Sequence, residues 1–438
     1  KVYQTLPVSG SQRIEKCHLS TNDGYTNIVS IMNCIKKTSL SICSLLLAGS
    51  IFSQTTTTPP IAHSKPGINI SLWKNISTQH DDTTRNTIFN LGLYSSINRL
   101  NGLGINILGT TIRQEANGMA VSGIFNAAQG KARGLQLAGI TNINGNDFSG
   151  ISVSGLVNLT SYQMKGLLLS GLTNITGNYS RGAVLGGLLN FCGEEATGFH
   201  LAGLADISST DFSGASLSGF INVAGNNLYG LQIAGITSIA ANHMTGVQIS
   251  GLGNIAGGKV CGLQLSPINI ATDAKGLQIG IVNYYKNNFD GLQLGLVNAN
   301  PHTRIQLMLF GGNTSKLNMG VRFKNQLFYT ILGGGTHYLD FSDKFSASCF
   351  YRAGLSLPLC QRFSISGDLG YQHIETFKNE SNTVPARLYA LQARINLEYN
   401  VTERFGIFCT SGYGISRPYT QNRNFDKGLI WEGGIILF

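Results

Sequence analysis

Charge and proline are both scarce in this chain. Only 12% of the 438 residues are charged, about half of the usual share of ~25%, and nine are proline. So little charge argues against a coiled coil, a helical bundle and a charge-rich disordered protein. A single long apolar run, near the N-terminus, argues against a bundle of membrane helices. Glycine, in contrast, is abundant, with 55 residues, and this composition is typical of an all-β chain or a membrane barrel.

The net charge of +10 is not concentrated in any one segment of the chain. Residues 118–300 carry seven charges of each sign, so the excess is spread over the two flanking regions. A nucleic-acid-binding surface needs a basic stripe with interleaved aromatic residues, and none is apparent. We therefore expect no nucleic-acid partner.

The first 53 residues have the features of an export signal. The pair Lys36-Lys37 precedes an apolar run that is too short to span a bilayer comfortably, and small residues follow it. We predict a signal peptide over 32–53 that begins at Met32, and an upstream extension over 1–31. An uncleaved anchor with an N-terminal tail is the alternative. The threonine- and proline-rich segment that follows predicts a linker over 54–85.

Few cysteines would remain after removal of the signal peptide. They are Cys192, Cys261, Cys349, Cys360 and Cys409. An odd number without CxxC spacing supports neither a disulfide framework nor a zinc site. We expect isolated apolar fillers.

An internal repeat dominates the middle of the chain. Ten leading glycines lie sixteen residues apart, at Gly118, Gly134, Gly150, Gly166, Gly182, Gly198, Gly214, Gly230, Gly246 and Gly262. Gly276 and Gly291 continue the series at spacings of fourteen and fifteen. In most units a second glycine follows the leading glycine by five residues. From Asn126 to Asn254 an asparagine follows the leading glycine by eight residues, with Asp206 and Ser238 as the exceptions.

Apolar residues alternate within each repeat, as at Leu135 and Leu137, which is the period of a β-strand. Such short strands bury their apolar face only by stacking, so we predict a parallel β-solenoid over 86–300, with glycine at its corners. The glutamines two places after the leading glycine are then expected to point outward. They are Gln136, Gln232, Gln248, Gln264, Gln278 and Gln293. Their face is interpreted as solvated or, alternatively, as a flat surface that binds glycan or protein.

The repeats hold no pattern that predicts catalysis. The recurrent asparagine is interpreted as a stacked amide ladder, with a ligand row as the alternative. The acids Asp147, Glu194, Glu195, Asp206, Asp211, Asp273 and Asp290 occupy scattered repeat positions, and His200 and His243 are isolated. Cleavage of polysaccharides needs clustered carboxylates. We therefore predict no enzyme, with no catalytic, cofactor-binding or metal-binding residues and no cofactor.

After residue 300 the repeat gives way to longer alternating segments. Eight are recognisable, at 304–311, 317–323, 326–338, 345–357, 363–374, 387–400, 404–415 and 428–438. In the clearest, Tyr389 and Tyr399 lie on the apolar face, ~33 Å apart along a strand, which suits aromatic girdles around a ~25 Å apolar band. The pattern predicts an antiparallel eight-stranded transmembrane β-barrel over 301–438.

Connection lengths and the chain terminus agree with a barrel. Short turns at 324–325, 358–362 and 401–403 alternate with longer polar loops, as in outer-membrane barrels with short periplasmic turns, and Phe438 resembles their terminal signature. Five charged residues fall on the polar face: Arg322, Arg352, Asp368, Arg394 and Glu398. We expect them to pair inside a filled barrel, with a narrow conductive path as the alternative.

The repeat motif resembles that of bacterial surface-repeat proteins, whose units read Gly-Leu-x-x-Ser-Gly-Leu-x-Asn. The best matches are residues 166–174 and 246–254, and the resemblance covers about 102–300. It implies a Gram-negative surface protein but no activity. With a periplasmic C-terminus, however, an even number of strands also starts the barrel in the periplasm, which predicts a periplasmic solenoid. The predicted location is therefore the outer membrane, with the solenoid periplasmic or, alternatively, surface-exposed.

Together these features predict a non-enzymatic outer-membrane protein whose barrel anchors a β-solenoid that acts as a scaffold or adhesion surface. The expected partners are the lipid bilayer of the outer membrane and an unknown protein or glycan. A glycan-binding or glycan-processing solenoid and a narrow outer-membrane channel are the alternatives.

Overall fold

The computed structural model is built from β-strands, and the part of the chain that it describes contains no helix. It describes residues 66–73, 76–79, 86–325, 327–340, 343–380, 383–420 and 423–438. The predicted extension over 1–31, the signal peptide over 32–53 and the first part of the predicted linker lie outside these residues. In the described ranges, then, no helix is available to span a membrane.

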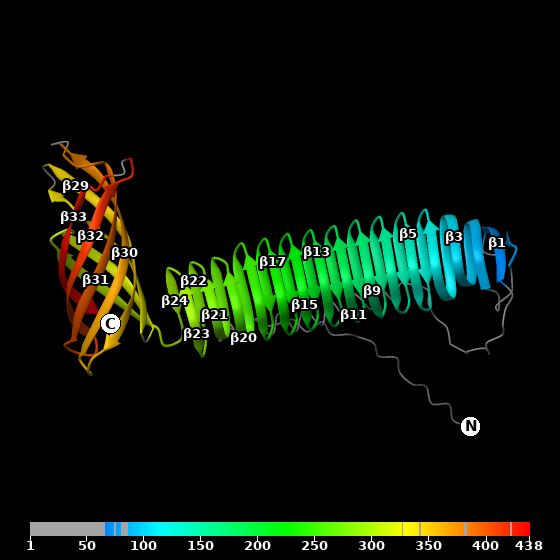
Figure 1. Cartoon of the computed structure of the whole chain (residues 1–438), viewed down its shortest axis with the longest axis horizontal. Coiled ribbons are helices and arrows are strands. Elements are labelled where there is room, and N and C mark those ends of the chain that lie inside the picture. The colour runs from blue at the N-terminus through cyan, green and yellow to red at the C-terminus, as the bar shows by residue number, and fades with distance from the viewer. Residues whose placement is uncertain are drawn as a thin grey trace, which may run out of the picture. The chain divides into compact units, whose positions relative to one another are not determined.

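The described residues between 66 and 299 form a parallel β-solenoid whose coils stack one on the next (Figure 1). One ladder of strands contains β5 (Ala132–Ala138), β7 (Phe148–Ser154), β9 (Gln163–Ser170), β11 (Tyr179–Gly186), β13 (Ala196–Ala202), β15 (Phe212–Ser218), β17 (Leu228–Ala234), β19 (Met244–Ser250) and β23 (Phe289–Leu294). The second ladder contains β4 (Phe125–Ala128), β6 (Thr141–Asn144), β8 (Val157–Thr160), β10 (Thr173–Thr176), β12 (Leu189–Cys192), β14 (Ala205–Ser208), β16 (Ile221–Ala224), β18 (Thr237–Ala240), β22 (Val282–Tyr285) and β24 (Val297–Ala299). Three long strands, β3 (Asn86–Ser122), β20 (Gly253–Leu265) and β21 (Ile268–Ile279), contribute to both ladders.

Neighbouring coils pair in register, so that equivalent residues lie one above the other. Gly182 pairs with Gly166 on one side and with Gly198 on the other. The coil after Gly262 is shorter, and its pairing offset falls in two steps: Asn254 pairs with Asn269, fifteen residues on, and Val260 pairs with Ala274, fourteen residues on. The missing residues are lost at the turns, and the strands keep their register. The predicted solenoid is confirmed.

The solenoid begins earlier than the sequence suggests. Strand β1 (Pro66–Trp73) pairs in parallel with the start of β3, for example Ile70 with Leu91, and β2 (Ile76–Ser77) pairs antiparallel with β1. The prediction of a linker over 54–85 is therefore wrong for these two strands. A single rung at the end of an array has only one neighbour, and its serine- and asparagine-containing strand carries no glycine period that would reveal it.

The side chains of the long-strand ladder face the opposite way from expectation. The glutamine two places after the leading glycine points inward, and Gln248 and Gln264 are completely buried. The apolar residues on either side of it point outward, and Leu292 and Leu294, which flank Gln293, are 49% and 46% exposed. The expectations that the glutamines face solvent and that stacking buries the alternating apolar residues are both wrong. Alternation separates the two sets but does not say which set is inside.

Most of the large apolar side chains in the interior of the repeats come from one position, two residues before the leading glycine. Phe148, Met164, Phe212, Leu228 and Met244 occupy it and are fully buried. Leu168 is fully buried at a second position, two residues after the leading glycine. The core is therefore narrow, with one main column of large apolar side chains beside buried amides and small residues.

Both glycine series lie too close to the backbone of the preceding coil for a Cβ, and the leading glycines also have a positive φ. The leading glycines have φ between +112° and +155°, a region that other residues rarely adopt. At Gly171, of the second series, no positive φ is found, but an added Cβ would lie 2.0 Å from the carbonyl oxygen of Gly155 in the preceding coil. The predicted glycine corner is thus enforced by close approach of stacked backbones.

The described residues between 304 and 437 form a closed antiparallel barrel of eight strands (Figure 1). The strands are β25 (Arg304–Gly312), β26 (Leu317–Asn325), β27 (Phe328–Thr336), β29 (Lys344–Pro358), β30 (Phe363–Asn379), β31 (Arg387–Asn400), β32 (Phe405–Pro418) and β33 (Asp426–Leu437). A short β28 (Leu339–Asp340) pairs with the start of β29. The barrel closes between β25 and β33, where Leu309 pairs with Ile435. All eight predicted segments are confirmed, with small shifts at their ends.

The barrel has one end with short turns and one end with longer loops. The connections β26–β27, β29–β30 and β31–β32 lie at the end where β25 begins and β33 finishes. Strand β24 of the solenoid ends at Ala299, shortly before β25 begins at Arg304. By connectivity, the solenoid and the C-terminus therefore both join the barrel at its short-turn end.

Candidate functional site

The barrel lumen collects the charged side chains that alternation places on the inner face. Along β31 the side chains of Gln392, Arg394, Asn396 and Glu398 are buried, whereas those of Leu391, Ile395 and Leu397 are exposed. Arg322, Arg352 and Asp368 on other strands also point inward. The five charged residues predicted to lie inside are all confirmed there.

Arg322 and Glu398 form a two-pronged ion pair across the lumen. The two Nη atoms of Arg322 donate to the two carboxylate oxygens of Glu398 at 2.7 and 3.1 Å, and Arg322 Nε donates to Gln306 Oε1 at 2.6 Å. Ser366 Oγ donates to the same carboxylate at 2.9 Å. Both charges are therefore compensated by hydrogen bonds as well as by each other.

A second ion pair contains one carboxylate and two guanidinium groups. Glu432 Oε2 accepts hydrogen bonds from Arg352 Nη1 at 3.0 Å and from Arg394 Nε at 3.2 Å. The Arg352 guanidinium also lies over the rings of Phe310 and Phe350, at 4.6 and 4.8 Å from their centroids. Sequence reasoning did not assign Glu432 to the lumen. The predicted inner set had three arginines and two acids, and this imbalance is a signal that could have pointed to Glu432.

Asp368 has no cationic partner at salt-bridge distance among the described residues. Its Oδ2 accepts hydrogen bonds from Tyr329 Oη at 2.9 Å and from Asn396 Nδ2 at 2.8 Å. Its Oδ1 is buried without a hydrogen-bond partner in the described part of the chain. With Asp368 the lumen holds three arginines and three acids, so these six charges balance. They fill the barrel and tie together strands that are far apart in sequence.

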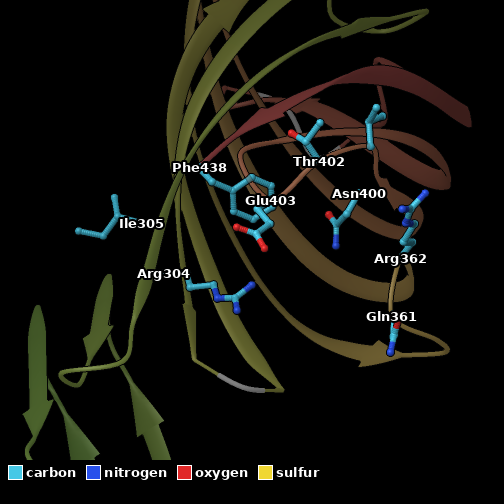
Figure 2. Close-up of a pocket in the computed structure, with 9 residues that line it drawn as sticks. Arg304, Ile305, Gln361, Arg362, Asn400, Thr402, Glu403 and Phe438 are labelled. Atoms are coloured by element: carbon cyan, nitrogen blue, oxygen red, sulfur yellow. The ribbon is translucent and has the colours of Figure 1, made fainter.

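At the short-turn end the barrel opens into a pocket of about 830 Å³ (Figure 2). Its lining comes from the start of β25, two turns and the chain terminus: Arg304, Ile305, Gln361, Arg362, Asn400, Val401, Thr402, Glu403 and Phe438. Figure 2 shows Arg304 and Arg362 well apart across this opening. Its charges are of both signs and sit on exposed turns, so the pocket has the character of a vestibule and contains no paired nucleophile and base.

Two amide ladders run through the solenoid interior. Asn142 Nδ2 donates to Asn158 Oδ1 at 3.1 Å, and Asn158 Nδ2 donates to Asn174 Oδ1 at 3.0 Å. Gln264 donates to Gln248 at 3.0 Å and accepts from Gln278 at 2.7 Å. The predicted asparagine ladder is present, and the glutamines form a second one that the sequence reasoning placed outside.

One coil replaces the amides with a buried acid and a histidine. His200 Nδ1 lies 3.0 Å from Asp206 Oδ1, and Ser216 Oγ donates to the other oxygen of Asp206. His200 had been interpreted as isolated, which is wrong. The six-residue spacing that joins it to Asp206 also joins Ser152 to Asn158 at 2.9 Å, so the repeat itself contained the signal. Because Ser216 contacts the carboxylate and not the imidazole, the set lacks the nucleophile–base contact of a hydrolase.

The other acids of the solenoid remain apart. Asp147 pairs with Lys131 at 3.4 Å, Asp290 with Lys275 at 3.8 Å, and Asp211 accepts from Asn226 at 2.8 Å. The backbone nitrogen of Lys259 donates to Nδ1 of the exposed His243 at 3.1 Å. Within the described ranges, no three histidine, cysteine, aspartate or glutamate side chains are arranged to hold a metal ion.

Cys192 is the one buried cysteine of the described chain. Its Sγ donates to the carbonyl oxygens of Asn178 and Glu195 at 3.0 and 3.2 Å. Burial raises the pKa of this thiol to about 12. Cys192 therefore fits the predicted role of a filler, whereas Cys261, Cys349, Cys360 and Cys409 are exposed and do not.

Comparison with protein-family models and with curated protein sequences finds no match for this chain.

Proposed function

We propose that the protein is a non-enzymatic outer-membrane protein, in which the eight-stranded barrel is the anchor and the β-solenoid is a scaffold. The observation that carries the proposal is the polarity of the barrel wall. Leu355, Leu369, Leu391 and Ile395 point outward and are 57–71% exposed. Large apolar surfaces of this kind are rare on soluble monomers and are the rule on barrels that face lipid.

Aromatic residues border the apolar band at both ends. Phe363 and Tyr399 pack together at the short-turn end, with ring centroids 4.7 Å apart. Tyr371 and Tyr389 stack at the other end, with centroids 6.4 Å apart. Tyr389 and Tyr399 are ten residues apart on β31, so the two girdles lie ~33 Å apart along the strand and ~23 Å apart vertically at a 45° tilt. This spacing supports a membrane-spanning band.

The lumen supports an anchor rather than a channel. Six balanced charges and the rings of Phe310, Phe350 and Tyr329 occupy the interior. Eight-stranded barrels are just wide enough for side chains to fill them. We therefore assign no transport role to the barrel.

Connectivity supports a periplasmic solenoid. Outer-membrane barrels keep short turns in the periplasm and longer loops outside. The solenoid joins the short-turn end, and so does the C-terminus. The likeness of its repeats to those of bacterial surface proteins would favour the outer face instead. We propose a periplasmic solenoid because the connectivity of an eight-stranded barrel supports that side.

An arginine on the lipid face tests the anchor. Ile395→Arg should reduce barrel insertion into bilayers, because a charge near mid-bilayer costs about 2–4 kcal/mol. The readout is the heat-modifiable migration of the folded barrel on gels. Thr420→Arg, in the exposed loop between β32 and β33, is the matched control and should insert normally. Equal insertion of both variants, or a full-length protein that stays in water without detergent, would contradict the membrane assignment.

Proteolysis tests the side of the membrane. In intact cells the solenoid should resist added protease, and it should become accessible once the outer membrane is permeabilised. Cleavage within residues 118–300 in intact cells would place the solenoid on the surface and would favour an adhesion role.

A further inference from the structure

The solenoid has an unusually apolar outer face on its long-strand ladder. We define the apolar face as the outward residues one and three places after each leading glycine, from Met119 to Leu294. All of these residues are apolar, and none is charged. The most exposed of them, Ile151, Leu292 and Leu294, show 45–49% of their surface to solvent. Alternation places these residues outward because the residue between each pair points inward, and in half of the coils that residue is a glutamine.

The size of the apolar face matches a stable protein interface. Twelve leading glycines mark its rungs, which at ~4.8 Å per rung give a length of ~57 Å. Its width of three residues at ~3.3 Å each, with side chains, makes an area of roughly 700 Å². A standard interface buries about 800 Å² on each partner. Exposed apolar patches of this size mark interaction sites.

The regularity of the face selects the kind of partner. Its side chains form ridges that repeat at the strand spacing along the whole solenoid, as the pairing of Leu201 with Leu185 and Leu217 shows. A partner fits such ridges over many rungs only if its own surface has the same period. A second copy of this chain has that period, and sheets pack face to face at ~10 Å when their apolar side chains interdigitate.

The absence of charge points the same way. The apolar face itself carries no charged residue, and the exposed basic residues Arg133, Lys165, Arg181 and Lys275 lie along one border of it, one place before the leading glycine. Homodimer interfaces are more apolar than other interfaces, are depleted of charge at their centre and have a polar rim.

We propose that the apolar face packs against the same face of a second copy of the chain, so that two solenoids form a four-layered, sheet-on-sheet dimer. This inference does not depend on where the barrel resides. The test uses the full-length protein, isolated from whichever cell fraction contains it, membrane or soluble.

Photo-cross-linking at an aromatic position tests the partner directly. Phe199 lies on the apolar face and is 43% exposed. Tyr162 lies in the turn between β8 and β9, outside the apolar face, and is 52% exposed. In full-length protein, Phe199→p-benzoylphenylalanine should give a cross-linked band at twice the chain mass. Tyr162→p-benzoylphenylalanine should not. Mixing two differently tagged copies shows that both halves of the band are this chain.

A charged side chain on the apolar face should make the dimer dissociate. Ile249→Glu and Thr245→Glu both place a carboxylate on the outer side of β19, the first on the apolar face and the second at its border, one place before the leading glycine Gly246. In the cross-linking background, Ile249→Glu should lower the dimer yield at least tenfold, because it buries an unpaired charge in the interface. Thr245→Glu should leave the yield nearly unchanged.

A neutral variant separates dimer loss from misfolding. Leu201→Gln places an uncharged polar side chain on the apolar face and should reduce the yield while the thermal midpoint stays close to that of the parent. The proposal is overturned if Phe199→p-benzoylphenylalanine captures only lipid or other proteins and gives no homodimer. It is also overturned if folded Ile249→Glu and Leu201→Gln cross-link as well as the parent.

Discussion

The solenoid and the barrel both enclose polar side chains and expose apolar ones, but they satisfy the polar groups in opposite ways. In the solenoid, neutral amides bond along the axis to the equivalent residue of the next coil, as Gln264 does to Gln248. In the barrel, charged groups bond across the lumen to strands far away in sequence, as Arg352 does to Glu432. A repeat can satisfy a polar interior with one residue type, whereas a barrel of unrelated strands needs complementary pairs.

The comparison predicts that single substitutions of buried polar groups lower the free energy of unfolding most in the barrel. Glu432→Gln should destabilise the folded barrel by about 3–5 kcal/mol, because it leaves two buried guanidinium groups without their carboxylate. The measurement is the midpoint of unfolding in urea, in lipid vesicles. Glu403→Gln, on an exposed turn, is the control and should have no measurable effect. Similar midpoints for both variants would show that the lumen charges are compensated in some other way.

Disruption of the backbone contacts between solenoid coils should cause the next largest loss of stability. Gly171→Ala places a methyl group 2.0 Å from the Gly155 carbonyl oxygen, so neighbouring coils must separate. We expect a loss of about 1–3 kcal/mol from this overpacking. Gly253→Ala is a matched control, because its nearest neighbour would be 3.7 Å away. Thermal melting followed by circular dichroism compares the two, and equal midpoints would remove the close-approach explanation.

The amide ladder should tolerate interruption better than the ion pairs do. Gln264→Leu removes the acceptor of Gln278 and the donor to Gln248, which leaves buried amide groups unpaired at a cost of about 1–3 kcal/mol. Replacement of the exposed Gln129 by leucine should be nearly neutral. If Gln264→Leu proved stabilising in thermal melts, the ladder would be dispensable and packing alone would hold the coils.

The smallest expected effect is a difference in thiol reactivity between a buried and an exposed cysteine of the solenoid. Because burial raises the pKa of Cys192 to about 12, its thiolate is scarce at pH 8, and its reaction with a maleimide should be at least tenfold slower than that of the exposed Cys261. Variants that keep one of these two cysteines and replace the rest with serine allow the comparison by mass spectrometry. Equal rates would mean that the coil around Cys192 opens readily.

Much of this architecture is predictable from periodicity. The sixteen-residue spacing of the glycines predicts a parallel solenoid, and the eight alternating segments predict the barrel. Periodicity does not predict which side chains of the solenoid face inward. The alternation at Leu135, Gln136 and Leu137 is equally compatible with buried leucines and with a buried glutamine. The prediction assumed that apolar residues are buried, but hydrogen bonding between stacked amides and the narrow space between the sheets reverse this in the structure.

Long-range pairs in the candidate site were the hardest to anticipate. The inner face of the barrel follows from alternation, so Arg394 and Glu398 were assigned correctly. Which acid meets which arginine depends on strand tilt and closure, and so Glu432 was missed. The contact between His200 and Asp206 was not predicted, although the six-residue spacing between them recurs between Ser152 and Asn158.

The shortened coil after Gly262 has a consequence for how such a chain can change over generations. Its strands stay in register although two residues are lost at the turns, so the fold tolerates small deletions there. Loss or gain of a whole unit, as occurs by recombination between similar gene segments, would change the length by one rung of ~4.8 Å and leave the neighbouring units intact. The solenoid can therefore act as an adjustable spacer whose reach is set by the number of copies it carries.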